Sequence, residues 1–146
     1  MKIAIGSDHA GFEFKKRLIQ ELASRFKDVS FEDVGTHDAS SVDYPDYADR
    51  VAQKIKSGTP YGILICGSGQ GMCMRANRYL FVRAALVYSV EVAKLARQHN
   101  NANVICLGAR LIDFDLALLS CAAFFSTDFE GGRHSLRVEK LKGEPK

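Results

Sequence analysis

The sequence predicts an α/β fold in which helices cover both faces of a parallel sheet. Apolar runs of strand length alternate with helix-like stretches along the whole chain, as expected for repeated strand–helix–strand units. The third of these runs, residues 62–66 (GILIC), is apolar throughout, which is typical of a strand buried on both faces. The 146 residues contain no internal repeat, low-complexity tract or linker, so we expect a single domain over residues 1–146.

Five strands are expected, at residues 2–6, 30–34, 62–66, 82–87 and 103–107. Six helices are expected, at residues 11–26, 45–56, 72–77, 89–99, 113–125 and 131–142. In the first helix, Phe14, Leu18 and Leu22 recur every four residues and form one apolar face. The last helix has few apolar positions, so we expect residues 131–146 to form a C-terminal helix and tail that contacts a partner subunit.

The formal net charge of +3 is concentrated near the C-terminus, where residues 131–146 hold five Arg or Lys and two Glu. This excess is smaller than the basic stripe that nucleic-acid binding requires, and it favours a small anionic ligand. No apolar run reaches the ~20 residues that span a membrane, and residues 1–6 lead into no signal peptide. We therefore expect a cytoplasmic protein that binds neither nucleic acid nor membrane.

Three polar loops follow the expected strands, at residues 7–9, 67–71 and 108–110. In open α/β sheets, ligands bind beyond the carboxyl ends of the strands, so these loops are the expected binding site. The loop at residues 67–71 (GSGQG) leads from a strand into a helix, and its glycines let backbone N–H groups point at a negative charge. The alternative for this loop is a tight strand–helix turn that binds nothing.

Neither nucleotide-binding fingerprint is complete. The pattern G-x-G-x-x-G would need glycine at Met72, and the P-loop-like spacing of Gly6 and Gly11 is followed by Phe12 and Glu13 instead of Lys-Ser/Thr. The His, Cys, Asp and Glu residues take no recognisable metal-ligand spacing. We therefore expect no nucleotide cofactor and no metal.

Cys66 ends the third strand directly before the glycine-rich loop. A nearby helix N-terminus or cation favours the thiolate of a cysteine, which then serves as a base or nucleophile. A buried core cysteine is the alternative, and it is the interpretation we favour for the other three cysteines, because the four form no C-x-x-C pair. Ser68 is suited either to donate to an oxyanion or to cap a helix.

Further positions carry suitable chemistry together with a structural alternative. Asp8 and His9 can handle hydroxyl protons, although an aspartate after a strand also caps helices. His99 closes the fourth long helix, where a histidine also stabilises the helix dipole. Arg133 and Arg137 are four residues apart, so we expect them on one helix face, as a phosphate clamp or as a solvated basic surface.

Six separated segments resemble the family of ribose-5-phosphate isomerase B and galactose-6-phosphate isomerase. These segments are IAIGSDHAGFEFK, DVGTHD, DYPDYA, GILICGSGQGM, RQHNNANVICLGAR and FEGGRHSLRVEKL, and together they cover nearly the whole chain in order. The resemblance implies a Rossmann-like three-layer α/β/α sandwich with a five-stranded parallel sheet. It also implies a homodimer or homotetramer with active sites between subunits, in which His99, Asn100 and Arg110 come from the neighbouring subunit.

The resemblance implies roles for individual residues. Cys66 is the implied base that moves a proton between C1 and C2, and the Ser68 hydroxyl with the loop amides stabilises the enediolate. His99 assists opening of the furanose ring. The implied substrate-binding residues, whose three arginines hold the phosphate, are Asp8, His9, Gly67, Ser68, Gly69, Gln70, Gly71, Asn100, Arg110, Arg133 and Arg137.

We therefore expect an aldose–ketose isomerase of the pentose phosphate pathway that interconverts D-ribose 5-phosphate and D-ribulose 5-phosphate. An enediolate mechanism needs a base, oxyanion donors and a phosphate clamp but no cofactor, which agrees with the residues present. Two alternatives stay open. One is an isomerase of the same family that acts on allose or galactose 6-phosphate, and the other is a non-catalytic sugar-phosphate-binding subunit.

Overall fold

The structure of the protein is a computed structural model that describes residues 1–143. All five strands are parallel and lie side by side in the order β2-β1-β3-β5-β4. The strands are β1 (Lys2–Ser7), β2 (Ser30–Asp33), β3 (Tyr61–Cys66), β4 (Ala84–Leu86) and β5 (Val104–Gly108). The expected five-stranded parallel sheet is therefore confirmed.

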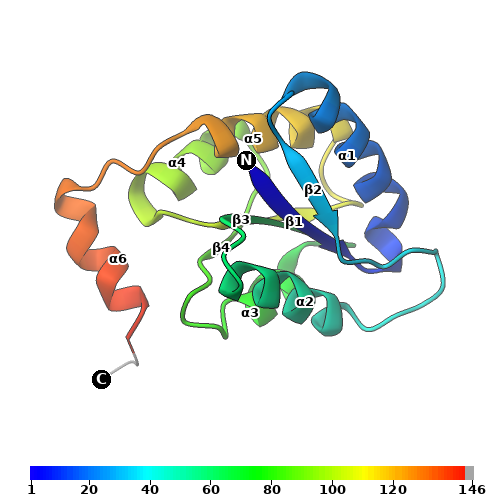
Figure 1. Ribbon diagram of the computed structural model, residues 1–146, viewed down its shortest axis with the longest axis horizontal. Coiled ribbons are helices and arrows are strands. Elements are labelled where there is room, and N and C mark those ends of the chain that lie inside the picture. The colour runs from blue at the N-terminus through cyan, green and yellow to red at the C-terminus, as the bar shows by residue number, and fades with distance from the viewer. Residues whose placement is uncertain (144–146) are drawn as a thin grey trace.

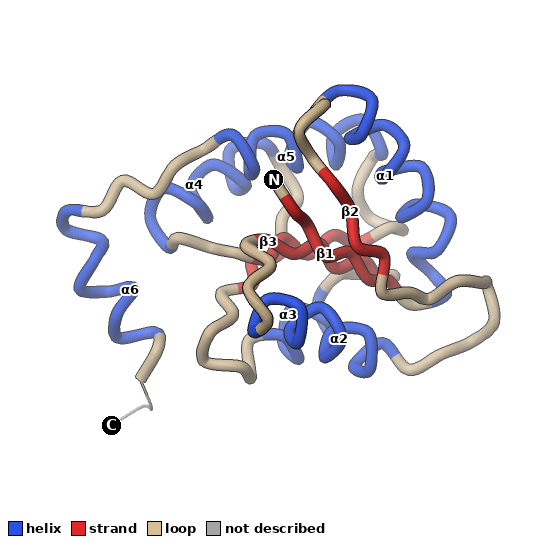
Figure 2. The backbone as a smooth tube through the Cα atoms, viewed as in Figure 1, coloured by secondary structure: helices blue, strands red, loops and turns tan. Residues whose placement is uncertain are grey.

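Helices cover both faces of this sheet, so the fold has the three expected layers (Figure 1). One outer layer holds α1, α4 and α5, and the opposite layer holds α2 and α3. Figure 2 shows these helices in blue on the two sides of the red strands. Their bounds are α1 (Phe12–Arg25), α2 (Tyr44–Lys56), α3 (Gln70–Ala76), α4 (Val90–Asn100) and α5 (Phe114–Ser126). Within residues 1–143, no helix combines the length and apolarity that crossing a membrane requires.

The apolar run of β3 divides its side chains between two cores. Ile63 and Ile65 lie in the core beneath α1, α4 and α5, whereas Leu64 and Cys66 lie in the core beneath α2 and α3. Successive side chains of a strand point to opposite faces, and both faces of β3 are covered, so every one of these residues is buried. Cys66 is consequently the last side chain of β3 on the α3 side of the sheet.

Helix α3 begins at Gln70, two residues before the expected start at Met72. Gly69 precedes it with φ of 77°, a left-handed conformation that turns the chain directly from the loop into the helix. A Cβ atom on Gly69 would lie 2.8 Å from the carbonyl carbon of Leu107 and 3.0 Å from the amide nitrogen of Gly108. Glycine is therefore required here both for its conformation and for the close approach of the loop to β5.

We expect Gly69→Ala to destabilise the fold by about 2–4 kcal/mol, because alanine is strained at this positive φ and also collides with the β5 backbone. Gly58→Ala is the matched control, since Gly58 has φ of 100° but no atom lies within 4 Å of the position that a Cβ would take. That variant should lose only about 1 kcal/mol. Urea unfolding of both variants measures the difference, and equal losses would show that the contact with β5 is unimportant.

The C-terminal segment differs from the single expected helix at residues 131–142. Gly131 and Gly132 have φ of 65° and 53°, so the chain makes the short helix η2 (Gly132–His134) before α6 (Ser135–Leu141). Figure 1 shows α6 at the edge of the molecule, away from the sheet. Val138 is buried, whereas Leu136 is 76% exposed, so α6 presents apolar surface to its surroundings. Residues 144–146 of the expected tail lie outside the described residues.

Candidate active site

A pocket of about 350 Å³ opens at the carboxyl edge of the sheet, where β1, β3 and β5 end. It is lined by Asp8, Tyr44, Cys66, Gly67, Ser68, Gly71, Arg110 and Leu111. Six of these residues are among those expected from the sequence. The site lies between β1 and β3, where the strand order reverses, which is where ligands bind in open α/β sheets.

Cys66 is 5% exposed and meets one backbone donor of the glycine-rich loop. The N–H of Gly69 donates to its Sγ at 3.1 Å, and such a donor stabilises negative charge on sulfur. Within the described residues, the N–H groups of Gly67 and Ser68 donate to no protein acceptor. Two backbone donors thus remain for an oxyanion beside the thiol, as the geometry of an oxyanion hole requires.

The Ser68 hydroxyl faces both the pocket and the start of α3. Its Oγ accepts a long hydrogen bond of 3.4 Å from the N–H of Gln70, so the capping role expected as an alternative is partly realised. Gln70 itself does not line the main pocket. It lines a smaller cavity of about 120 Å³ that shares Ser68 and Leu111 with the main pocket.

Asp8 and His9 lie at the end of β1, and each makes one contact that fixes its orientation. The Asp8 carboxylate accepts a hydrogen bond from the N–H of Gly11 at 3.1 Å, so Asp8 caps η1 (His9–Gly11) while it lines the pocket. Nδ1 of His9 accepts a hydrogen bond of 3.2 Å from the N–H of Val42. A neutral His9 held this way carries its proton on Nε2, which leaves that nitrogen as a donor.

Arg110 lies in the pocket of its own chain, contrary to the expectation that it comes from a neighbouring subunit. The reason is the register of β3 and β5, in which Cys66 pairs with Gly108, two residues before Arg110. The side chain lies so close to the loop that a Cβ on Gly67 would be 3.2 Å from its Nη1. The guanidinium therefore supplies positive charge beside Cys66 within one subunit.

Tyr44 and Leu111 also line the pocket, and neither is expected there from the sequence. The Tyr44 ring covers the start of α3 so closely that a Cβ on Gly71 would lie 2.6 Å from its Cζ. Tyr44 belongs to the segment DYPDYA, one of those that carry the family resemblance. That segment is the available signal, but a tyrosine next to a proline at a helix start carries no chemistry that identifies it.

The remaining cysteines are consistent with packing roles. Cys106 and Cys121 are fully buried, and burial raises the pKa of the Cys121 thiol to about 12. Cys73 is half-buried on α3, and its Sγ donates to the carbonyl oxygen of Ala84 at 3.4 Å. These surroundings distinguish them from Cys66, which is the cysteine that meets the loop amides.

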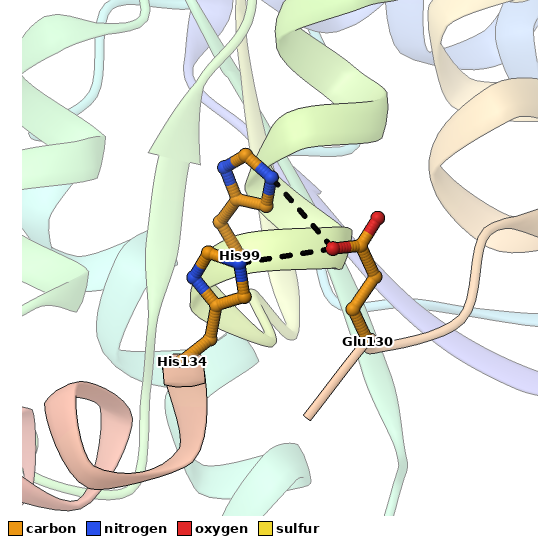
Figure 3. Close-up of side chains that lie close together, drawn as sticks. All are labelled: His99, Glu130 and His134. Atoms are coloured by element: carbon orange, nitrogen blue, oxygen red, sulfur yellow. Dashed lines mark ion pairs between the residues drawn. The ribbon is translucent and has the colours of Figure 1, made fainter. Parts of the chain in front are cut away.

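A second group of expected residues lies outside this pocket, around the end of α4 and the C-terminal segment. The imidazoles of His99 and His134 stack with centroids 4.2 Å apart, and Glu130 approaches both rings (Figure 3). Asn100, at the end of α4, lines a groove of about 440 Å³ that also contacts Leu141 of α6. These positions do not join Cys66 in the pocket of the same chain.

Arg133 and Arg137 do not share one α-helix, because the double-glycine turn places Arg133 in η2 and Arg137 in α6. They are nevertheless close, since Nη1 of Arg137 donates to the carbonyl oxygen of Arg133 at 2.8 Å. Together with the histidine pair, these two guanidinium groups form one basic cluster where the end of α4 meets η2 and α6. Such a cluster suits an anion such as a phosphate.

Among the described residues, His99, Glu130 and His134 offer three metal-ligand atoms within 4.8 Å of one another. However, Nε of Arg133 donates to Nε2 of His134 at 3.4 Å, which occupies the lone pair that a metal would need. The neighbouring guanidinium groups also oppose a divalent cation. This arrangement is better suited to exchanging protons and binding an anion than to holding a metal.

Comparison with known proteins identifies the family. The family model described as ribose/galactose isomerase matches residues 3–141. Ribose-5-phosphate isomerase B of Escherichia coli is 40% identical over 141 residues, which are 96% of this chain and 93% of that protein.

Solved structures agree with this comparison. A ribose 5-phosphate isomerase from Thermotoga maritima superimposes with a TM-score of 0.93 at 49% identity, covering 97% of each chain. Ribose-5-phosphate isomerase B from Mycoplasma genitalium, with bound ribulose-5-phosphate, gives a TM-score of 0.90 at 42% identity and covers 97% of this chain and 93% of that one. This chain therefore belongs to the ribose/galactose isomerase family and is a sugar-phosphate isomerase.

Proposed function

We propose that the protein interconverts D-ribose 5-phosphate and D-ribulose 5-phosphate through an enediolate, as a step of the pentose phosphate pathway. The observation that carries the proposal is the pocket in which the Cys66 thiol, free loop amides and Arg110 lie together. The Mycoplasma genitalium relative was solved with ribulose-5-phosphate, which favours a pentose phosphate over a hexose phosphate for this pocket.

In this mechanism the Cys66 thiolate removes the proton from C2 of the open-chain aldose, and the electron pair moves onto the oxygen at C1. The Ser68 hydroxyl and the N–H groups of Gly67 and Ser68 donate to the oxygens of the enediolate. The thiol then returns the proton to C1, while the C2 hydroxyl passes its proton to the oxygen at C1, so that C2 becomes the ketone and C1 carries the hydroxyl. Carbon is oxidised at C2 and reduced at C1 within one molecule, so no external oxidant or cofactor is needed.

We further propose that a second copy of the chain completes each active site. His99, Asn100, Arg133 and Arg137 are the expected ring-opening and phosphate-binding residues, but they lie outside the pocket that contains Cys66. The exposed Leu136 and the groove beside α6 offer apolar surface for this contact. In this proposal residues 1–146 act as one domain, with residues 131–146 reaching the partner in a homodimer or homotetramer.

The substrate is tested by assaying isomerisation of ribose 5-phosphate, allose 6-phosphate and galactose 6-phosphate in the presence of a chelator. We expect kcat/KM for the pentose to exceed that for either hexose by about tenfold or more, because a pocket fitted to five carbons loses at least about 1.4 kcal/mol of binding on misfit. Faster turnover of a hexose phosphate would assign the protein to the hexose branch. Inactivity on all three would favour a non-catalytic binding subunit.

A further inference from the structure

The carboxylate of Glu130 lies beside a stacked pair of imidazoles, within 4 Å of both Nε2 atoms, and the mechanism above gives it no role. Its Oε2 is 3.9 Å from Nε2 of His99 and 3.7 Å from Nε2 of His134, as the dashed lines in Figure 3 show. The two rings are nearly parallel, with an interplanar angle of 10°. One carboxylate oxygen is thus shared by a stacked histidine pair that comes from α4 and η2.

The backbone holds this arrangement in place. The N–H of Glu130 donates to the carbonyl oxygen of Gln98 at 3.1 Å, which ties the loop before η2 to the last turn of α4, next to His99. Gly131 and Gly132 then reverse the chain, and the N–H of His134 donates to the carbonyl oxygen of Gly131 at 3.0 Å. Glu130 and His134 therefore meet although no α-helix contains both.

The groups around His134 oppose a proton on its Nε2. Nε of Arg133 donates to Nε2 of His134, so this nitrogen accepts and carries no proton. Burial, the neighbouring His99 and the guanidinium groups of Arg133 and Arg137 lower the pKa of His134, and Glu130 opposes them. Two stacked imidazoles do not both hold a charge easily, and these contacts act to keep His134 neutral.

We propose that Glu130 is a positioning residue that holds a proton on Nε2 of His99 and thereby leaves Nδ1 of His99 to exchange the proton of ring opening. The Glu130 carboxylate lies 3.9 Å from Nε2 of His99, at ion-pair distance, and a negative charge so close favours a proton on that nitrogen and leaves the other nitrogen for exchange. Nδ1 of His99 makes no hydrogen bond within residues 1–143. Glu130 also stabilises the imidazolium, which is the form that acts as an acid.

This inference rests on the proposed function, in which the furanose ring of ribose 5-phosphate must open before isomerisation. In that step the bond between C1 and the ring oxygen breaks, and the ring oxygen takes the proton from Nδ1 of His99. The C1 hydroxyl gives its proton to the Asp8 carboxylate of the completed site as C1 becomes the aldehyde. The step breaks one C–O bond and moves two protons without any net oxidation or reduction of the sugar, so it needs no co-reactant.

The protonation states are measured without turnover, by ¹⁵N NMR of histidine-labelled protein across a pH range of about 5–9. In the wild type, we expect the neutral imidazole of His99 to carry its proton on Nε2 and the neutral imidazole of His134 to carry its proton on Nδ1. In Glu130→Gln, the pH at which the pair takes up its proton should fall by about one unit, because the carboxylate charge is lost. Glu139→Gln on α6 is the matched control and should leave both titrations in place, because Glu139 pairs with Lys142 instead.

The kinetic arm of this experiment compares pH profiles for ribose 5-phosphate. Glu130→Gln should lower kcat near neutral pH by about tenfold. It should also move the high-pH limb of the profile, where the acid form is lost, to lower pH, whereas Glu130→Asp should recover part of the loss. Unchanged histidine titration and tautomers in Glu130→Gln would overturn the role of Glu130, whatever happened to kcat. A wild-type protein inactive on ribose 5-phosphate would instead contradict the proposed function, and the NMR result would still decide the role of Glu130.

Discussion

Cys66→Ala is expected to lower kcat for ribose 5-phosphate by about 10²–10⁴-fold, because the variant lacks the base that moves the proton between C2 and C1. KM should change little, since the phosphate-binding groups are untouched. The removed Sγ is small and its loss leaves the core beneath α2 and α3 otherwise intact. Steady-state assays at several pH values measure the effect, with thermal unfolding as the check on folding.

Cys73→Ala is the matched control for this prediction. Cys73 is a half-buried thiol that packs against the same core, but its Sγ donates to the Ala84 carbonyl instead of meeting the loop amides. Its replacement should leave kcat within about twofold of wild type, because packing changes of this size affect stability more than chemistry. If Cys66→Ala were as active as Cys73→Ala, the base would have to be another group of the pocket.

Co-expression of Cys66→Ala with His99→Ala is expected to restore roughly a quarter of wild-type activity from two nearly inactive proteins. The reason is geometric, because the proposed site combines Cys66 of one subunit with His99 of the other. With random pairing about half of the dimers are mixed, and each mixed dimer has one intact site out of two. The measurement is the specific activity of the co-expressed protein against each variant alone.

Co-expression of Cys66→Ala with Arg110→Ala tests the opposite case. Cys66 and Arg110 line one pocket of the same chain, so pairing with another subunit cannot bring an intact Cys66 and an intact Arg110 together. A mixed dimer of these two variants instead leaves each pocket without one of the two groups, so this pair should give no restoration. Recovery here, or failure of the His99 pair to recover although mixed dimers form, would contradict the assignment of these residues to their subunits.

Much of the fold and the core of the candidate site follow from short-range features of the sequence. The unbroken run GILIC predicts a strand buried on both faces, and the structure confirms it as the centre of the sheet. Cys66 and the glycine-rich loop are adjacent in the chain, so their meeting needs only a strand, a turn and a helix in succession. Patterns of this kind act over a few residues, and local geometry alone determines them.

The double-glycine turn shows where a local pattern is insufficient. The sequence predicts one helix over residues 131–142, but positive φ at Gly131 and Gly132 separates η2 from α6. Glycine adopts left-handed and right-handed backbone conformations with similar ease, so the sequence leaves the choice open. Here the choice is made by the tie between Glu130 and the last turn of α4.

The α/β class, the five strands and the thiol beside an anion-binding loop can all be derived from the sequence. The order of the strands cannot, and it is because β5 rather than β4 lies next to β3 that Arg110 enters the pocket of its own chain. The same holds for Tyr44, which covers the start of α3, and for Glu130, whose carboxylate approaches both His99 and His134. These contacts join residues distant in the chain or displaced by a turn, and they depend on strand order and register, which the packing of the whole core selects.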